Sequence, residues 1–242
     1  MIKEILFPNK FNQFVWFNAI FLLFLVVFNY ADSLTVVFAY FLETIIIGII
    51  HCVKLLLVSK YGQKGTSKGF GDFKGIGLVF FFLFHYGMFV GVQSVFAFTL
   101  FESEFSGIKD GFNILDNYSF IIQSEGMSMV LGSLVLTNLG YLYTNFLSNE
   151  KYKDYTPEEI FIKPYARIFI QQFVVLLAFF FYVIFSDPIV AAILLIFFRL
   201  LVDLVIVSIR KDSDVLDTLA RKSSNSYDHY LEMKKKYQEF SE

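Results

Sequence analysis

The residues of this chain that could do chemistry are ionisable side chains that lie inside long apolar stretches. They are Glu43, His51, Lys54, His85, Arg199 and Asp203. A charge deep in a lipid bilayer is unfavourable by a few kcal/mol or more, so such a group normally faces a partner or a water-filled path. Carboxylate, imidazole and guanidinium groups placed in this way can pair with one another, bind a cation or exchange protons.

The apolar residues are gathered into blocks of about 20, the length of helix that crosses the hydrocarbon core of a membrane. The chain is 56% hydrophobic, whereas a soluble domain is about 45–50% apolar. The sequence therefore predicts an all-α polytopic transmembrane helix bundle over residues 1–210. Its six spans are expected at about 12–29, 35–60, 76–101, 127–146, 165–185 and 189–209.

Charged residues between the spans predict the orientation of the bundle. Lys and Arg outside the spans gather at the N-terminus, in 60–74, in 147–166 and in the tail, whereas residues 102–125 are acidic. The positive-inside rule then places both termini in the cytoplasm. The first apolar stretch has no small-residue cleavage site after it, so we expect a retained helix and not a signal peptide.

Two segments outside the spans mix polar and apolar residues. Residues 102–125 hold Phe112 and Leu115 among the acids, which favours a segment resting on the membrane surface. The polar tail, 211–242, is predicted to be partly an amphipathic helix whose apolar stripe is Tyr230, Met233, Tyr237 and Phe240. That stripe either packs locally or attaches to anionic lipid or to a cytoplasmic protein partner.

The depth of each buried group follows from the rise of 1.5 Å per helical residue. Glu43 and His85 each lie roughly 13 Å from one end of their spans, and Arg199 is also near the midplane. A second polar set is expected about two turns closer to the cytoplasm. It comprises His51, Lys54, Gln171, Gln172 and Asp203.

Charge balance predicts which of these groups meet. Glu43 is expected to pair with Arg199, and Asp203 with Lys54, because an unpaired buried charge costs far more than a pair. The spans around 35–60, 76–101 and 189–209 would then pack about Glu43, Arg199 and His85. The alternative is that these contacts only fix helix register: Lys54 would reach the membrane surface, His51 and His85 would be hydrogen-bonded core residues, and Asn138 and Gln171 would join helices.

No pattern in the sequence indicates a metal or a cofactor. His51, Cys52 and His85 lack the close spacing of a metal site, and the two histidines are expected at different depths, which disfavours a haem. Nucleotide-binding glycine motifs and nucleophile motifs are also absent from the sequence. The net charge of −2 predicts no nucleic-acid partner.

Four short segments resemble a family of bacterial and archaeal membrane proteins catalogued as domain of unknown function 6498. They are YFLETIIIG (40–48), FFLFHYGMF (81–89), PYARIFI (164–170) and RLLVDL (199–204). The resemblance implies that Arg167 belongs to the same polar pattern as Glu43, Lys54, His85, Arg199 and Asp203. It also implies that His is usual where this chain has Gln172, and that Lys is common at position 199. It implies no activity.

Three functions remain open on the sequence. The first is binding or translocation of protons, ions or a small solute by the midplane polar cluster, in which case six helices are few and a homo-oligomer is expected. The second is a non-catalytic scaffold or subunit that recruits a partner through its tail. The third is an intramembrane enzyme acting on a lipid or a quinone.

Overall fold

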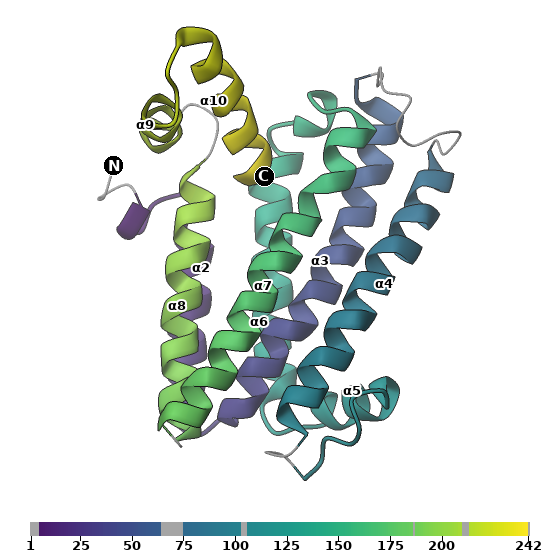
Figure 1. Cartoon of the computed structure of the whole chain (residues 1–242), viewed down its shortest axis with the longest axis vertical. Helices are drawn as coiled ribbons and strands as arrows, with labels where there is room; N and C mark the ends of the chain where they lie inside the picture. Colours follow the sequence, from purple (N-terminus) through teal and green to yellow (C-terminus); the bar gives the residue numbers. More distant parts are fainter. Residues whose placement is uncertain (1–4, 64–74, 103–105, 186, 210–212, 242) are drawn as a thin grey trace.

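The protein is an all-helical bundle whose long helices run side by side (Figure 1). The computed structural model describes residues 5–63, 75–102, 106–185, 187–209 and 213–241. The long helices are α2 (Gln13–Val27), α3 (Ser33–Tyr61), α4 (Ile76–Phe101), α6 (Met127–Tyr141), α7 (Pro157–Phe185) and α8 (Pro188–Ser208). The shorter elements are α5 (Ile114–Ile122), a π-helix (Leu142–Leu147) that continues α6, a 3-10 turn (Lys151–Lys153), α9 (Asp214–Lys222) and α10 (Tyr227–Ser241).

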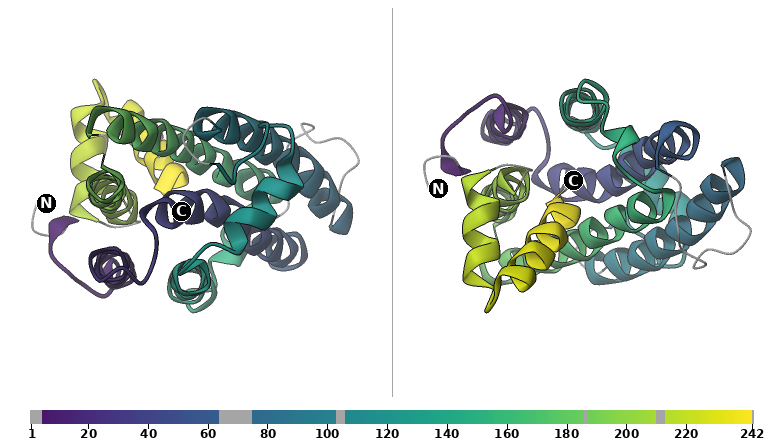
Figure 2. Two further views of the ribbon diagram at one scale, coloured as in Figure 1. Left: turned by 90° about the horizontal axis from the view of Figure 1, so that it is seen from below. Right: turned by 90° about the horizontal axis from the view of Figure 1, so that it is seen from above.

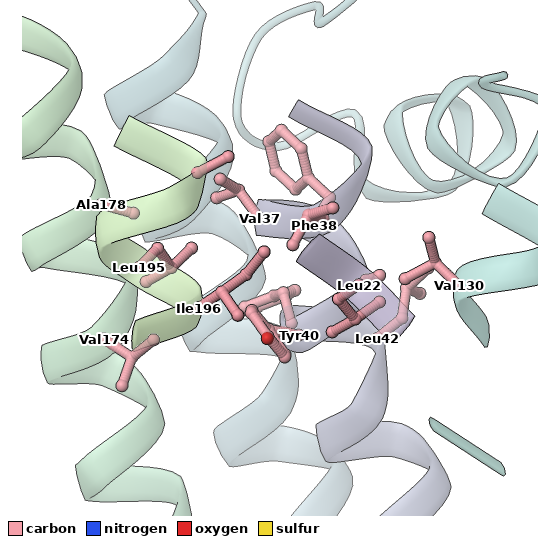
Figure 3. Close-up of a cluster of buried hydrophobic side chains, with 14 of the residues drawn as sticks. Leu22, Val37, Phe38, Tyr40, Leu42, Val130, Val174, Ala178, Leu195 and Ile196 are labelled. Carbon is pink, nitrogen blue, oxygen red and sulfur yellow. The ribbon is translucent and has the colours of Figure 1, made fainter. Parts of the chain in front are cut away.

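Helix α3 occupies the interior of the bundle. It packs against α4, α6, α7 and α8, and the end-on views place α2 and α6 on one side of it and α4 and α7 on the other (Figure 2). Every residue from Val36 to Thr44 is buried, so this stretch is covered on all sides, as expected of a helix that is apolar all round. Figure 3 shows Phe38 and Tyr40 of α3 beside Ile196 of α8 and Leu22 of α2.

Helix length and composition support the membrane class of protein. Within the described residues, four helical segments are long and apolar enough to cross a membrane: Thr35–Tyr61, Ile76–Phe101, Pro157–Phe185 and Ile189–Ser208. A fifth is added if α5 and the α6–π segment, which meet at 95°, are taken as one broken span. Helix α2 has only 15 residues, about 22 Å at the usual rise, which is short of the ~30 Å core of a bilayer.

Helix α7 begins earlier than the span predicted at 165–185. Thr156 and Glu159 form a capping box: the Thr156 hydroxyl accepts from the Glu159 amide at 3.3 Å, and the Thr156 amide donates to Glu159 Oε2 at 2.9 Å. The helix that starts there runs on through Pro164 to Phe185 as one element.

The acidic segment 102–125, of which residues 103–105 lie outside the described part, folds into α5 across one end of the bundle (Figure 1). The Tyr118 hydroxyl is 2.7 Å from Ser94 Oγ of α4, and Asn117 is buried against the backbone of Lys109. Phe112 and Leu115 point outward and are strongly exposed. Their contact with a membrane surface stays a prediction.

The tail folds back as a pair of helices at the opposite end of the molecule (Figure 1). Tyr237 packs by the buried cluster of Ile209, Val215 and Leu216, and Lys235 of α10 lies 3.7 Å from Glu159 of α7. Part of the predicted apolar stripe is therefore covered by the chain itself, whereas Phe240 has a side chain outside the described set. This geometry favours local packing of the tail.

Asp217 of α9 fastens α10 through a salt bridge of 2.6 Å to Lys234 and a hydrogen bond of 3.0 Å from the Tyr230 hydroxyl. The hydrogen bonds from Lys234 and Tyr230 hold the pKa of the Asp217 carboxyl below its ordinary value. A lowered carboxyl pKa stabilises the folded tail above the ordinary value of about 3.9, and this contribution is lost as the pH falls through the lowered pKa.

We therefore expect the α9–α10 contact to loosen in acid. A nitroxide label at position 233 (Met233→Cys in a Cys52→Ser background) should give an immobilised electron paramagnetic resonance spectrum at neutral pH and a mobile one below the pKa of Asp217. In Asp217→Asn the label should be equally mobile at both pH values. A label that stays immobilised in acid, or in the variant, would contradict this account.

Candidate functional site

Glu43 is the centre of the buried polar cluster. It lies in the enclosed part of α3 and is 1% exposed. Its Oε2 forms a salt bridge with Nη2 of Arg199 on α8, and its Oε1 accepts a hydrogen bond of 2.6 Å from Nδ2 of Asn138 on α6. The predicted pairing of Glu43 with Arg199 is confirmed, and Asn138 joins helices as expected. One carboxylate thus links three helices.

Arg199 is shared between two carboxylates. Its Nε lies 3.2 Å from Oδ2 of Asp203, one turn further along α8, while Nη2 contacts Glu43. The guanidinium also lies over the Tyr40 ring, with its carbon 3.8 Å from the ring centroid. The planar fork of arginine suits such simultaneous contacts, whereas lysine would present a single ammonium group.

The sequence reasoning missed Tyr40, although a signal for it exists. Tyr40 precedes Glu43 by three residues, so the two share a face of α3. A ring on that face is the natural surface for a guanidinium that reaches the carboxylate, because arginine stacks on aromatic faces.

The predicted pair of Asp203 with Lys54 is wrong. Asp203 pairs with Arg199, and Lys54 Nζ lies over the Phe146 ring at 5.0 Å from its centroid. The physical reason is an axial offset. Helices α3 and α8 run in the same direction, and Lys54 lies eleven residues beyond Glu43, or roughly 16 Å, whereas Asp203 lies only about 6 Å beyond Arg199.

The expectation that His85 joins Glu43 and Arg199 is also wrong. Among the described residues, His85 makes its only hydrogen bond to Tyr165 of α7, with 2.6 Å between Nδ1 and the phenol oxygen. Its neighbour Tyr86 is the residue that faces α3, since its hydroxyl donates to the Thr44 carbonyl at 2.8 Å. Counting along the helix fixed the depth of His85 but not the side of α4 on which it lies.

His51 has a structural partner on α7. Its Nε2 lies 2.7 Å from the carbonyl oxygen of Ile160, so Nε2 carries the proton and donates. Pro164 is four residues after Ile160 and has no amide hydrogen, which leaves that carbonyl without its helical partner. His51 fills this gap, and the interpretation of His51 as a hydrogen-bonded core residue is favoured.

Further polar contacts join the helices, and the sequence analysis did not single them out. Gln93 Nε2 of α4 donates to the Ile168 carbonyl of α7 at 3.0 Å, and Ser133 of α6 donates to Asn18 Oδ1 of α2 at 2.8 Å. Gln172 Oε1 is buried without a hydrogen-bond partner in the described part of the chain. The side chains of Arg167 and Gln171 lie outside the described set.

The charge cluster is not arranged as a metal site. Over the ranges that the structure covers, no group of three or more His, Cys, Asp or Glu side chains is placed to hold a metal ion. The cluster's two carboxylates instead face a guanidinium and an amide. The contacts that hold the cluster together are therefore ion pairs and a hydrogen bond.

Comparison with known proteins agrees with the segments noted in the sequence. The model of a family of unknown function (DUF6498) matches residues 1–225. The chain belongs to this family. The match covers the whole bundle together with α9, so the residues of the charge cluster lie within the matched region. No curated protein and no solved structure matched the chain, and the DUF6498 family brings no activity with it.

The cluster predicts a large effect of removing its cation. Arg199→Ala leaves the buried Glu43 carboxylate without its cation, and breaking a buried pair in this way typically costs about 3–5 kcal/mol. We expect the free energy of unfolding in detergent to fall by that amount, with a smaller fall for Arg199→Lys. The exposed Lys222→Ala serves as the control, with a change within about 0.5 kcal/mol. A loss under about 1 kcal/mol for Arg199→Ala would show that the pair adds little to stability.

Proposed function

We propose that this protein binds a proton or a small cation at Glu43, Arg199 and Asp203 and passes it across the membrane. The observation that carries the proposal is one buried guanidinium held between two carboxylates, of which one comes from α3 and the other from α8 itself. Ionisable groups at this depth are functional candidates because placing a charge within the bilayer is energetically unfavourable.

The charges of the three groups support uptake of a cation. When all three are ionised they carry one net negative charge, in a region where Glu43 and Arg199 are almost fully buried. A proton on a carboxylate, or a bound cation, would neutralise that charge. Asp203 is the more accessible acid, with 22% of its side chain exposed against 2% for Glu43, so we infer that it is the entry point.

The second carboxylate makes Glu43 able to change its charge. In an isolated buried pair, protonating the acid would strand the guanidinium at a cost of several kcal/mol. Here Arg199 keeps Asp203 as a partner when Glu43 is neutral. The Asn138 amide, which has both donor and acceptor atoms, can serve either form of Glu43. Glu43 is therefore the group we expect to load and release the proton.

We further propose six crossings with both termini in the cytoplasm, in the inner membrane of a prokaryote. The direction of the long helices supports this topology, since α2 and the α6–π segment run alongside the four long spans (Figure 1). The distribution of Lys and Arg between the predicted spans favours the side of the bundle that carries the termini as the cytoplasmic side.

Proton flux into liposomes tests the proposed function. Protein reconstituted into vesicles that contain a pH-sensitive dye should dissipate an imposed pH gradient when potassium and valinomycin balance the charge. Glu43→Gln should abolish this flux, because the amide keeps the size of the side chain but does not take up a proton, while Arg199 retains Asp203. Asp203→Asn should slow the flux.

The matched control is Asp116→Asn, which neutralises an exposed acid of α5 outside the bundle core. Its flux should equal that of the wild type. Wild-type flux no faster than that of protein-free vesicles, or a Glu43→Gln variant that folds normally and conducts fully, would contradict the proposal.

Thiol labelling tests the topology. In a Cys52→Ser background, Asn149→Cys and Ser226→Cys should react with an impermeant maleimide only after the cells are opened, and Ser119→Cys should react in intact cells. All three positions are exposed in the structure. Labelling of position 149 or 226 in intact cells would overturn the proposed orientation.

A further inference from the structure

His85 lies in a set of aromatic rings between α4 and α7. Its imidazole stacks on Phe81 at 5.7 Å between centroids and 21° between planes, and meets Phe89 and Tyr165 edge to face at 5.2 and 5.4 Å. Phe161 closes the set, with its centroid 6.2 Å from the His85 ring. We call His85, Phe81, Phe89, Phe161 and Tyr165 the aromatic cluster.

Of the two ring nitrogens of His85, one is hydrogen-bonded within the described part of the chain and the other is not. Nδ1 is 2.6 Å from the Tyr165 hydroxyl. In the part of the chain that the structure describes, Nε2 makes no hydrogen bond, and the side chain is only half-buried.

The aromatic cluster lies at the outer surface of the bundle, where all of its members except the buried Phe161 are partly exposed. Leu83, Phe84 and Met88, on the same stretch of α4, are strongly exposed. The neighbouring Tyr86 hydroxyl meets the carbonyl of Thr44, next to Glu43, which places His85 level with the charge cluster. In a bilayer this is hydrocarbon, where a polar nitrogen without a partner is unfavourable by several kcal/mol.

A ligand that satisfies this nitrogen must come through lipid, lie flat against aromatic rings and carry an oxygen that can hydrogen-bond. We propose that His85 and Tyr165 bind the ring of a lipid-soluble quinone or quinol. The aromatic cluster supplies faces for a planar ring, and Nε2 supplies the hydrogen bond to the ring oxygen.

The hydrogen bond between His85 and Tyr165 fits both oxidation states of such a ring. When the Tyr165 hydroxyl donates to Nδ1, the imidazole proton is on Nε2, which donates to a quinone carbonyl. When Nδ1 carries the proton and donates to the Tyr165 oxygen, Nε2 accepts from a quinol hydroxyl. The proposal concerns binding alone and includes no electron transfer.

This site is independent of the proposed ion-binding function. It involves α4 and α7, whereas the charge cluster involves α3, α6 and α8, and no hydrogen bond or ion pair among the described residues joins His85 to Glu43 or Arg199. The two proposals can therefore fail separately.

Binding of decylubiquinone to the full chain in lipid nanodiscs tests the inference. Bound quinone is measured at equilibrium against empty nanodiscs, and saturable binding is expected. His85→Phe keeps a ring in the aromatic cluster but removes both nitrogens, and should weaken binding by about tenfold or more, the size of one lost hydrogen bond in an apolar site. Tyr165→Phe, which removes only the hydroxyl, should weaken binding severalfold.

The matched control is Tyr118→Phe, which removes the hydroxyl bonded to Ser94 away from this site and should leave the affinity unchanged. Glu43→Gln should also bind quinone normally, and His85→Phe should keep proton flux, which separates this inference from the proposed function. Absence of saturable binding, or equal affinity in the wild type and in folded His85→Phe and Tyr165→Phe, would overturn it.

Discussion

The bundle depends on the placement of a carboxylate where water does not reach. Glu43 lies on a stretch of α3 that is covered on all sides, so its charge has to be balanced by neighbouring helices. Arg199 and Asn138 meet it from α8 and α6, and this contact fixes the rotation and the axial level of all three helices at once. Apolar packing in lipid offers little preference for one rotation over another, whereas a hydrogen-bonded ion pair permits only one.

Buried polar contacts also join three helix pairs that the ion pair does not connect. A hydrogen bond from Tyr86 joins α3 to α4, one from His51 joins α3 to α7, and one from Ser133 joins α6 to α2. Each of these three seams thus has a polar contact that is satisfied within the bundle. Polar side chains at such depths are informative whether or not they take part in a reaction, because each one needs a defined neighbour.

Much of this arrangement could be predicted from sequence, and the errors have one physical origin. Apolar block length located the helices to within a few residues, apart from the start of α7, and charge balance found the pair of Glu43 with Arg199. Counting residues gives the depth of a group along its helix but not the direction in which it points across the bundle. His85 was therefore assigned to partners at its depth, although it lies on the other side of α4. Lys54 was assigned to Asp203, which is too far from it along the bundle axis. The role of His51 depended on Pro164 of a distant helix, which no local pattern on α3 could reveal.

The bare carbonyl left by Pro164 also constrains how the molecule can move. His51 satisfies that oxygen from α3, and it can do so only while the parts of α3 and α7 around His51 and Ile160 stay together. Separating them would expose a strong dipole to acyl chains, at a cost of several kcal/mol. Helices α3 and α7 should consequently behave as one rigid body during any opening of the protein. Access to Glu43 would then have to come by displacement of α2, α6 or α8 relative to this pair.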